Sequence, residues 1–387
     1  EVNFLSKIFN KVYLIPIKLH NKKIKQNKNV IIDYELISEI YNLKHLLVKL
    51  SKIITCKYFW TELISISYRN FFRKIKMIVT ERYLAESIFY YIKRKKINLK
   101  QNIFYSVWSN HTLMGFNLLK ENKLINYCFA RSLGQDISGF IPNDDYVAYF
   151  KPKFKNLDFV LVLNNGQIKK LLSNQITKKN KIIKNYLGMQ RSLSNKLNYK
   201  KDLLNFASCG SLNDVKNTLE IFKFIQVFSK NYPKIKVNYF CIGDGVEKEN
   251  LKLYAKNNFK LNNLKFSYIN KIPNLVNFLK RKRINYFINF SKSEGMSFAL
   301  MEAISCNIPI ICSKIAGNTE IMNGKNGYVI EKHDSKEYLS LSKNIIKNFT
   351  KKNYKTQVNN SKKIFLEKID RNKNLKEFYK ILKKKLL

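Results

Sequence analysis

Alternating strand and helix patterns between residues 203 and 330 constrain the fold of this 387-residue chain more than any other feature. Short apolar runs rich in β-branched and aromatic residues recur there, separated by longer runs with helical periodicity. Such apolar strands are typical of a parallel sheet covered by helices on both faces, which is a doubly wound α/β domain. The expected strands are 203–209, 237–242, 264–269, 285–290, 308–312 and 327–330, with helices near 216–230, 246–258, 273–282, 298–306 and 317–323.

The first half of the chain repeats this pattern less clearly. A long, basic and aromatic helical region at 36–97 interrupts it. Two interpretations of this region remain open: helices packed on a sheet, or an amphipathic segment on an anionic membrane surface. The two can coexist on opposite faces of the helices. The strands expected in this half are 12–17, 103–107, 125–130, 159–163 and 182–186.

The net charge is large, because 72 Lys and Arg stand against 27 Asp and Glu, giving +45. Only nine of these cations are Arg, the residue that forks onto phosphates and base edges, so no specific nucleic-acid partner is expected. The Lys excess accompanies abundant Asn, Ile, Phe and Tyr, the residues that an AT-rich genome over-encodes. A basic nucleic-acid-binding protein remains the weaker alternative, and attraction to anionic surfaces is the physical consequence of the charge.

Several other classes of protein are excluded. No run of 18 apolar residues lacks a charge, so no membrane-spanning helix is expected. The six Cys form no C-x-x-C motif and are typical of buried free thiols in a reducing compartment. Four scattered His form no metal motif, and Asp144-Asp145 is not a D-x-D motif, so no metal is expected.

The most specific motif occupies residues 293–311. A buried strand ends in a loop that carries Glu294, and Gly295 permits close backbone approach. A helix is expected to begin near 297–298, where its free N–H groups and positive dipole end favour an anion. Glu302 follows eight positions after Glu294. Two carboxylates beside amides that bind phosphate suit a nucleotide sugar.

The motif Glu294-x7-Glu302, followed by Ala303 and Pro309, resembles the E-x7-E signature of the retaining, GT-B-fold glycosyltransferases of family 4, also called glycosyl transferases group 1. The resemblance implies two Rossmann-like, doubly wound α/β domains that face a cleft. It also implies that Glu294 contacts the donor sugar and that Glu302 holds the ribose hydroxyls.

Further matches follow in the order that this family requires. Gly210-Ser211-Leu212 and then Lys216 resemble its G-R-L-x-x-x-K segment, in which Arg and Lys neutralise the donor diphosphate; here Ser211 replaces the Arg. Gly243 belongs to a match to the I-G-D-G turn. The resemblance therefore implies a catalytic role for Glu294 and Lys216, and donor binding by Gly210, Ser211, Gly243, Gly295, Met296, Ser297, Phe298 and Glu302.

In the first half, residues 131–136 resemble the R-A-H-G-x-D motif of a bacterial polysaccharide subgroup of the family. Arg131 and Asp136 match, but Leu133 stands where His belongs. Arg131, Asp136 and the nearby His111 are the candidates for the acceptor side.

The resemblance implies an enzyme that transfers a sugar, with retention, from a nucleotide diphosphate sugar to a glycan or lipid-linked acceptor in cell-surface polysaccharide biosynthesis. No cofactor or metal is expected. A degenerate member that binds nucleotide sugar without turnover is the alternative, because Ser211 and Leu133 depart from the pattern. The expected place is the cytoplasm, peripheral to the inner face of the membrane. The expected domains are an acceptor-binding domain at 1–188 that lacks the first strand, a donor-binding domain at 189–350, and a helical tail at 351–387 that packs back on the first domain.

Overall fold

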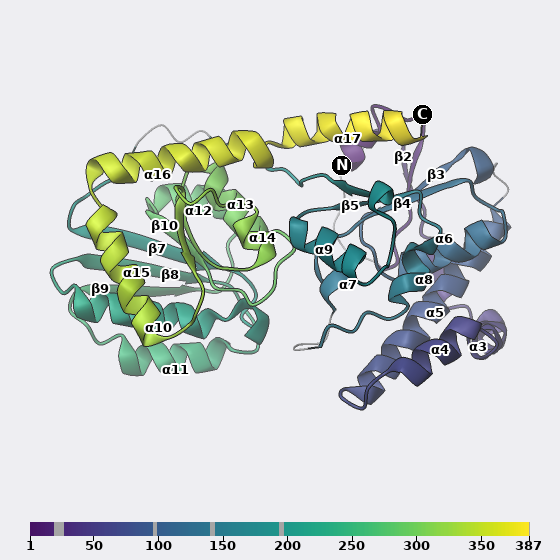
Figure 1. Cartoon of the computed structure of the whole chain (residues 1–387), viewed down its shortest axis with the longest axis horizontal. Helices are drawn as coiled ribbons and strands as arrows, with labels where there is room; N and C mark the ends of the chain where they lie inside the picture. The colour runs from purple at the N-terminus through teal and green to yellow at the C-terminus, as the bar shows by residue number, and fades with distance from the viewer. Residues whose placement is uncertain (19–26, 96–98, 140–143, 193–196, 387) are drawn as a thin grey trace. The chain divides into compact units, whose positions relative to one another are not determined.

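The computed structural model describes residues 1–18, 27–95, 99–139, 144–192 and 197–386 (Figure 1). The chain divides into two compact units, each described here by itself. The last two residues of the basic region 36–97, four residues of the segment that joins the expected domains, and Leu387 lie outside the described residues. The first unit comprises Glu1–Val162, Gln167–Asn185 and Glu377–Leu387, and the second comprises Leu163–Gly166 and Tyr186–Lys376.

The second unit contains a six-stranded parallel sheet in the order β12-β11-β10-β7-β8-β9. The order reverses between β7 and β10, and this reversal is where open α/β sheets bind their ligands. Three of the expected strands have the predicted bounds and the other three lie within two residues of them. The strands are β7 (Leu203–Cys209), β8 (Lys236–Ile242), β9 (Leu264–Ile269), β10 (Tyr286–Asn289), β11 (Ile310–Ser313) and β12 (Gly327–Ile330).

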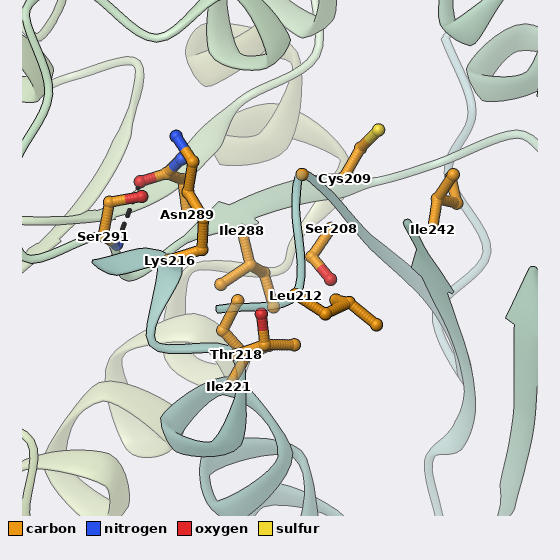
Figure 2. Close-up of a pocket in the computed structure, with 11 residues that line it drawn as sticks. Ser208, Cys209, Leu212, Lys216, Thr218, Ile221, Ile242, Ile288, Asn289 and Ser291 are labelled. Carbon is orange, nitrogen blue, oxygen red and sulfur yellow. Dashed lines mark hydrogen bonds between the residues drawn. The ribbon is translucent and has the colours of Figure 1, made fainter. Parts of the chain in front are cut away.

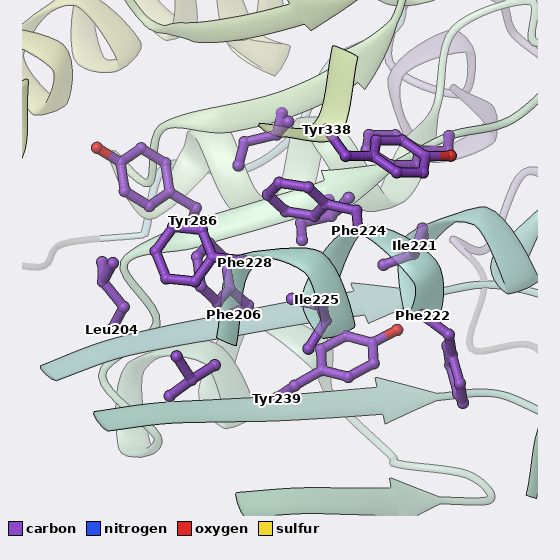
Figure 3. Packing of buried hydrophobic residues seen from close by; sticks show 14 of the residues in the cluster. Leu204, Phe206, Ile221, Phe222, Phe224, Ile225, Phe228, Tyr239, Tyr286 and Tyr338 are labelled. Atoms are coloured by element: carbon purple, nitrogen blue, oxygen red, sulfur yellow. The ribbon is translucent and has the colours of Figure 1, made fainter. Parts of the chain in front are cut away.

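Helices cover both faces of this sheet (Figure 1). On one face Phe224 and Phe228 of α10 pack edge-on against Phe206 of β7, with Tyr286 of β10 stacked alongside (Figure 3). Each such buried side chain contributes about 1.5–3 kcal/mol through the hydrophobic effect. The helices are α10 (Thr218–Asn231), α11 (Lys248–Asn258), α12 (Leu275–Arg281), α13 (Phe298–Ser305), α14 (Ala316–Thr319), α15 (Ser335–Asn348) and α16 (Lys351–Ile364).

The first unit contains a four-stranded parallel sheet in the order β3-β4-β5-β6 and a separate parallel pair, β1-β2. The expected strands appear at their predicted places: four of them end one to three residues early, and β4 begins two residues late and ends one residue late. β2 was not predicted, because its three residues are too few to show a period. The strands are β1 (Val12–Leu14), β2 (Val30–Ile32), β3 (Ile103–Ser106), β4 (Tyr127–Arg131), β5 (Phe159–Val162) and β6 (Ile182–Lys184).

This four-stranded sheet has a hydrophobic core on each of its faces. Neighbouring residues in a strand point to opposite faces, so each strand contributes to both cores. In β4, Ala130 joins the core beneath α5 (Phe71–Arg94) and α6 (His111–Glu121), whereas Phe129 joins a second core on the other face. This second core includes Phe378 and Leu382 of α17 (Arg371–Leu386). The last residues of α17 therefore complete the core of the first unit.

The basic region forms four helices. The apolar side chains of the second half of α5 pack into the core on one face of the four-stranded sheet. The packed interpretation is thus confirmed for α5. None of the helices among the described residues is long and apolar enough to cross a membrane. The helices of this unit are α1 (Val2–Leu5), α2 (Glu35–Ile40), α3 (Leu46–Ile54), α4 (Lys57–Ser65), α5 (Phe71–Arg94), α6 (His111–Glu121), α7 (Gln135–Ser138), α8 (Phe150–Lys155) and α9 (Asn165–Ser173).

Candidate active site

Two loops leave the carboxyl ends of β7 and β10 at the point where the strand order reverses. The first carries Lys216 in a short helical turn, whose amide donates to the side chain of Asn213 at 3.1 Å. The second carries Glu294. Nζ of Lys216 lies 2.5 Å from Oε1 of Glu294, and the two side chains retain 30% and 12% of their exposure. The two residues predicted to be catalytic are therefore brought together as an ion pair.

Further donors hold the Glu294 carboxylate. Oε1 of Glu294 accepts hydrogen bonds from the Ser291 hydroxyl at 2.9 Å and from the Asn289 side-chain amide at 3.4 Å. The side-chain oxygen of Asn289 in turn accepts from the amide of Ser291 and from the side chain of Asn318, both buried. Lys216, Asn289 and Ser291 lie together at one side of a small pocket (Figure 2). Sequence reasoning missed Asn289, Ser291 and Asn318, whose common signal is only that they lie at or after the carboxyl ends of buried strands.

The backbone of the Glu294 loop is braced from two other segments. Asn164 donates its side-chain amide to the carbonyl of Gly295 at 2.5 Å. Gly317 lies so close that a Cβ there would stand 2.3 Å from the carbonyl oxygen of Glu294 and 2.7 Å from that of Gly295. Only glycine at 317 allows this approach.

Helix α13 begins at Phe298, as predicted. Ser297 is its N-cap and accepts from the amide of Leu300 at 3.5 Å, which leaves the amides at the helix start directed towards the loop. Met296 is buried, whereas Phe298 is exposed. Asn307, with φ of +60°, takes the left-handed position after the helix.

Glu302 lies one turn into α13. Burial raises the pKa of its carboxyl group above the usual range. The carboxyl group makes no hydrogen bond or ion pair with any of the described residues. Besides burial, the negative charge of Glu302 raises the pKa of the Cys209 thiol at the end of β7, so the two side chains lie near each other. A half-buried carboxylate without a partner is suited to accept hydrogen bonds from hydroxyl groups.

The turns after β7 and β8 meet through glycine. Gly243 has φ of +150°, and a Cβ there would stand 1.9 Å from the carbonyl oxygen of Gly210. Ser211 is exposed in the same turn. Lys292, which the sequence did not single out, lies beside this loop: its amide donates to the carbonyl of Val215 at 2.8 Å.

The pocket at this point is lined by residues of both loops and of the strands that precede them. Thr218, the first residue of α10, also lines it, so a second helix begins at its wall. The lining residues are Ser208, Cys209, Gly210, Leu212, Lys216, Thr218, Ile221, Ile242, Ile288, Asn289 and Ser291.

In the first unit, the side chains of Arg131 and Asp136 are engaged within the protein. Arg131 is buried and donates to the carbonyl of Asn185 at 2.8 Å and to its side-chain oxygen at 2.7 Å. Asp136 is buried, accepts from the amides of Ser109 and Gly134, and its pKa is raised by that burial. Both side chains organise loops, and a contact with an acceptor stays a prediction.

His111 stands at the first position of α6. Its Nδ1 lies 3.8 Å from Oε1 of Glu81, which is paired with Lys153 at 2.8 Å. Burial lowers the pKa of His111, so its ring is neutral near pH 7. His111 is not bonded to Arg131 or Asp136 in the described structure. No group of three metal-ligating side chains occurs among the described residues.

Comparisons with known proteins find similarity to glycosyltransferases. Residues 189–364 match the family described as Glycosyl transferases group 1. The UDP-Gal:alpha-D-GlcNAc-diphosphoundecaprenol alpha-1,3-galactosyltransferase of Escherichia coli is 26% identical over 186 residues, a match that covers 46% of this chain and 46% of that protein. The chain therefore matches about half the length of this curated relative.

Solved structures share the fold. The pneumococcal O-GlcNAc transferase GtfA, in complex with UDP and GlcNAc, aligns with a TM-score of 0.59 at 18% identity, covering 79% of this chain and 60% of that one. Anabaena HepE in complex with UDP aligns with a TM-score of 0.62 at 13% identity, covering 79% and 84%. The predicted resemblance to group 1 glycosyltransferases is confirmed for residues 189–364, and so is the α/β, GT-B class with two Rossmann-like domains.

Proposed function

We propose that this chain, whose residues 189–364 match the group 1 glycosyl transferases, transfers a sugar from a nucleotide diphosphate sugar to a glycan or lipid-linked acceptor. The observation that carries the proposal is the meeting of Lys216 and Glu294 at the reversal of strand order. A cation, a carboxylate and a helix N-terminus converge there, and this is the set of groups that a sugar diphosphate requires.

The proposed chemistry is stabilisation of the departing nucleoside diphosphate. Lys216 leaves Glu294 when the donor binds, and its ammonium group then neutralises the charge that grows on the diphosphate. The amides at the start of α13 act on the same charge. Glu294 turns to the hydroxyls of the donor sugar. Because this route needs no carboxylate base, we propose departure from the front face and retention at the anomeric carbon.

Two further roles complete the proposed donor site. Glu302 accepts hydrogen bonds from the ribose hydroxyls. The pKa of its carboxyl group is raised by burial, and the group has no partner among the described residues. Lys292 supplies the second cation that Ser211 lacks, because its backbone is bonded to the loop that carries Lys216. Its Nζ lies 2.5 Å from Asp214, and the side chain is 46% exposed, so it is free to turn towards a diphosphate.

The acceptor and its cellular setting form the finer part of the proposal. The name of the Escherichia coli relative includes diphosphoundecaprenol, a lipid diphosphate, which supports a lipid-linked acceptor in cell-surface polysaccharide biosynthesis. Such an acceptor requires an enzyme in the cytoplasm that works at the inner face of the membrane. We propose no metal or cofactor for the reaction.

One observation favours a second candidate function, a binding protein without turnover. Ser211 and Leu133 stand where the family motif has Arg and His, and each replacement removes a polar contact to the substrate. A charge-assisted contact contributes about 1.5–3 kcal/mol, and where it acts on the charge of the departing diphosphate its loss lowers turnover while the remaining contacts still hold the nucleotide.

The experiment that separates these functions combines thermal shift with donor hydrolysis. UDP-, GDP- and ADP-sugars are offered to the protein, beginning with UDP-sugars because two similar proteins bind or use UDP. Release of the nucleoside diphosphate supports the transferase. A rise in Tm without any release supports the binding protein, and no response to any donor contradicts both.

A further inference from the structure

We propose that the outer face of α3, α4 and the start of α5 docks on an anionic lipid bilayer. Six large apolar side chains define this outer face: Leu43, Leu47, Ile54, Ile64, Tyr68 and Phe72. They are 56–94% exposed, and large apolar side chains gathered on one exposed surface mark an interaction site more often than single exposed ones do. The inference rests on the proposed function only for the reason that the protein would act at a membrane. Docking itself does not require turnover of the donor.

The outer face is continuous across the two helices. On α3 and the turn before it, Leu43, Leu47 and Ile54 recur at helical spacing, so they lie on one side. The indole of Trp60 donates to the carbonyl of Ile54 at 2.6 Å and so ties α4 to the end of α3. Ile64 lies one turn after Trp60 on the same side of α4. The ring centroids of Tyr68 and Phe71 lie 6.5 Å apart, and those of Phe71 and Phe72 lie 5.7 Å apart. These ring contacts extend the face to α5.

The opposite side of these helices already anchors them to the first unit. Lys49 of α3 is fully buried and lies 3.0 Å from Glu39. Lys74 of α5 pairs with Asp144 at 2.8 Å. These inner contacts fix the helices without help from the outer apolar side chains, so packing within the unit does not account for the outer ones.

The charge around the outer face selects the occupant. Residues 41–76 contain a single acid, Glu62, and its carboxylate accepts from the buried amide of Tyr149. Six exposed cations of this stretch stand against that one acid of its own; they are Lys44, Lys52, Lys57, Arg69, Arg73 and Lys76. A second copy of the chain would bring like charges together. Apolar and aromatic side chains flanked by Lys and Arg are the composition that binds the headgroup region of anionic bilayers.

The test is co-sedimentation with vesicles of phosphatidylcholine and phosphatidylglycerol, compared with phosphatidylcholine alone. The triple variant I64S/Y68S/F72S is expected to bind the anionic vesicles at least tenfold more weakly than the wild type, and salt is expected to weaken wild-type binding. The matched control is V246S/L253S, which removes two exposed apolar side chains of the second unit and should bind as the wild type does.

A spectroscopic measurement reports on the surface directly. The chain has two Trp residues, so W108F leaves Trp60 as the single indole. Its emission is expected to shift to the blue on addition of anionic vesicles. Docking is contradicted if the triple variant binds like the wild type, if the wild type ignores both vesicles, or if only an acidic protein binds this face.

The outcomes for docking and for the proposed function are separable. Donor hydrolysis in the absence of vesicles should be equal in the wild type and in I64S/Y68S/F72S. Vesicle binding without hydrolysis would overturn the proposed function and support docking. Hydrolysis without vesicle binding would support the proposed function and contradict docking.

Discussion

Lys216 and Glu294, 78 residues apart in the chain, form an ion pair with 2.5 Å between Nζ and Oε1. Each residue neutralises the other while the site holds no donor. This arrangement avoids an isolated charge in a partly buried site, which would be unfavourable. It also means that donor binding exchanges one ion pair for two new interactions, with diphosphate on the Lys216 side and sugar on the Glu294 side.

Replacement of Lys216 tests the proposed stabilisation of the leaving group. In K216M the stem of the side chain stays and the charge is lost, so kcat/KM for the donor should fall about 10- to 140-fold, the equivalent of about 1.5–3 kcal/mol. Steady-state hydrolysis measures this, and circular dichroism checks the fold. K223M, on the exposed side of α10, is the control and should keep the wild-type rate. An unchanged rate in K216M would remove Lys216 from the mechanism.

The missing Arg can be restored at Ser211. S211R should lower KM for the nucleotide sugar by roughly tenfold, because one charge-assisted contact with the diphosphate is regained. K292M should raise KM in the wild type and have less effect in S211R, since the two cations then serve the same phosphate. A double-mutant cycle on KM measures the coupling. Additive effects would show that Lys292 does not replace the Arg.

The pKa of Glu302 predicts a pH dependence of nucleotide binding. Burial raises this pKa, so the carboxyl group becomes neutral at a higher pH than an exposed Glu does. Ribose hydroxyls bind the ionised form more strongly, because it only accepts hydrogen bonds. Affinity for UDP should therefore decline on acidification through the raised pKa. Calorimetric titration of the wild type and of E302Q checks this; a wild type whose affinity follows E302Q at every pH would exclude the role.

Glu62 predicts a pH dependence of stability. Burial raises its pKa to about 7, from 4.5. Between these values the unfolded chain loses a proton that the folded chain keeps, so the contribution of Glu62 to stability is highest below pH 4.5 and falls as pH rises towards 7. The loss attributable to Glu62 is about 3 kcal/mol at most. Denaturant unfolding of the wild type and of E62Q should show this component in the wild type only. If the free energy of unfolding depended on pH in the same way in both proteins, Glu62 would be exposed to water rather than buried.

Gly317 tests the brace behind the Glu294 loop. The Cβ of G317A would overlap the carbonyl oxygens of Glu294 and Gly295, so the loop must move. A displacement of about 1 Å of catalytic groups is enough for a hundredfold loss of rate. Activity should fall on that order while the circular dichroism spectrum is kept. Wild-type turnover in G317A would show that the loop has room to adjust.

Most of the second unit could be predicted, because buried parallel strands leave continuous apolar runs and glycine marks the turns between them. The start of α13 near residues 297–298 was predicted as well, since it depends on the local sequence that follows a buried strand. Glu294 and Lys216 were predicted from the family motif, and the ion pair between them was not, because it depends on the strand order.

The parts that escaped prediction depend on contacts between distant segments. Asn164 reaches Gly295 across 131 positions, and Asn is too common in this chain to stand out. Arg131 and Asp136 matched a motif, but a motif identifies the residue and not the direction of its side chain; both are turned to partners within the protein.

The core of the first unit draws on both ends of the sequence, because Phe378 and Leu382 cover the face of Phe129 and Phe159. During synthesis the strands of this unit emerge before Phe378 and Leu382, which help to cover one of its faces. One face of the sheet therefore lacks Phe378 and Leu382 on the ribosome until about 190 further residues, most of the second unit, have been added.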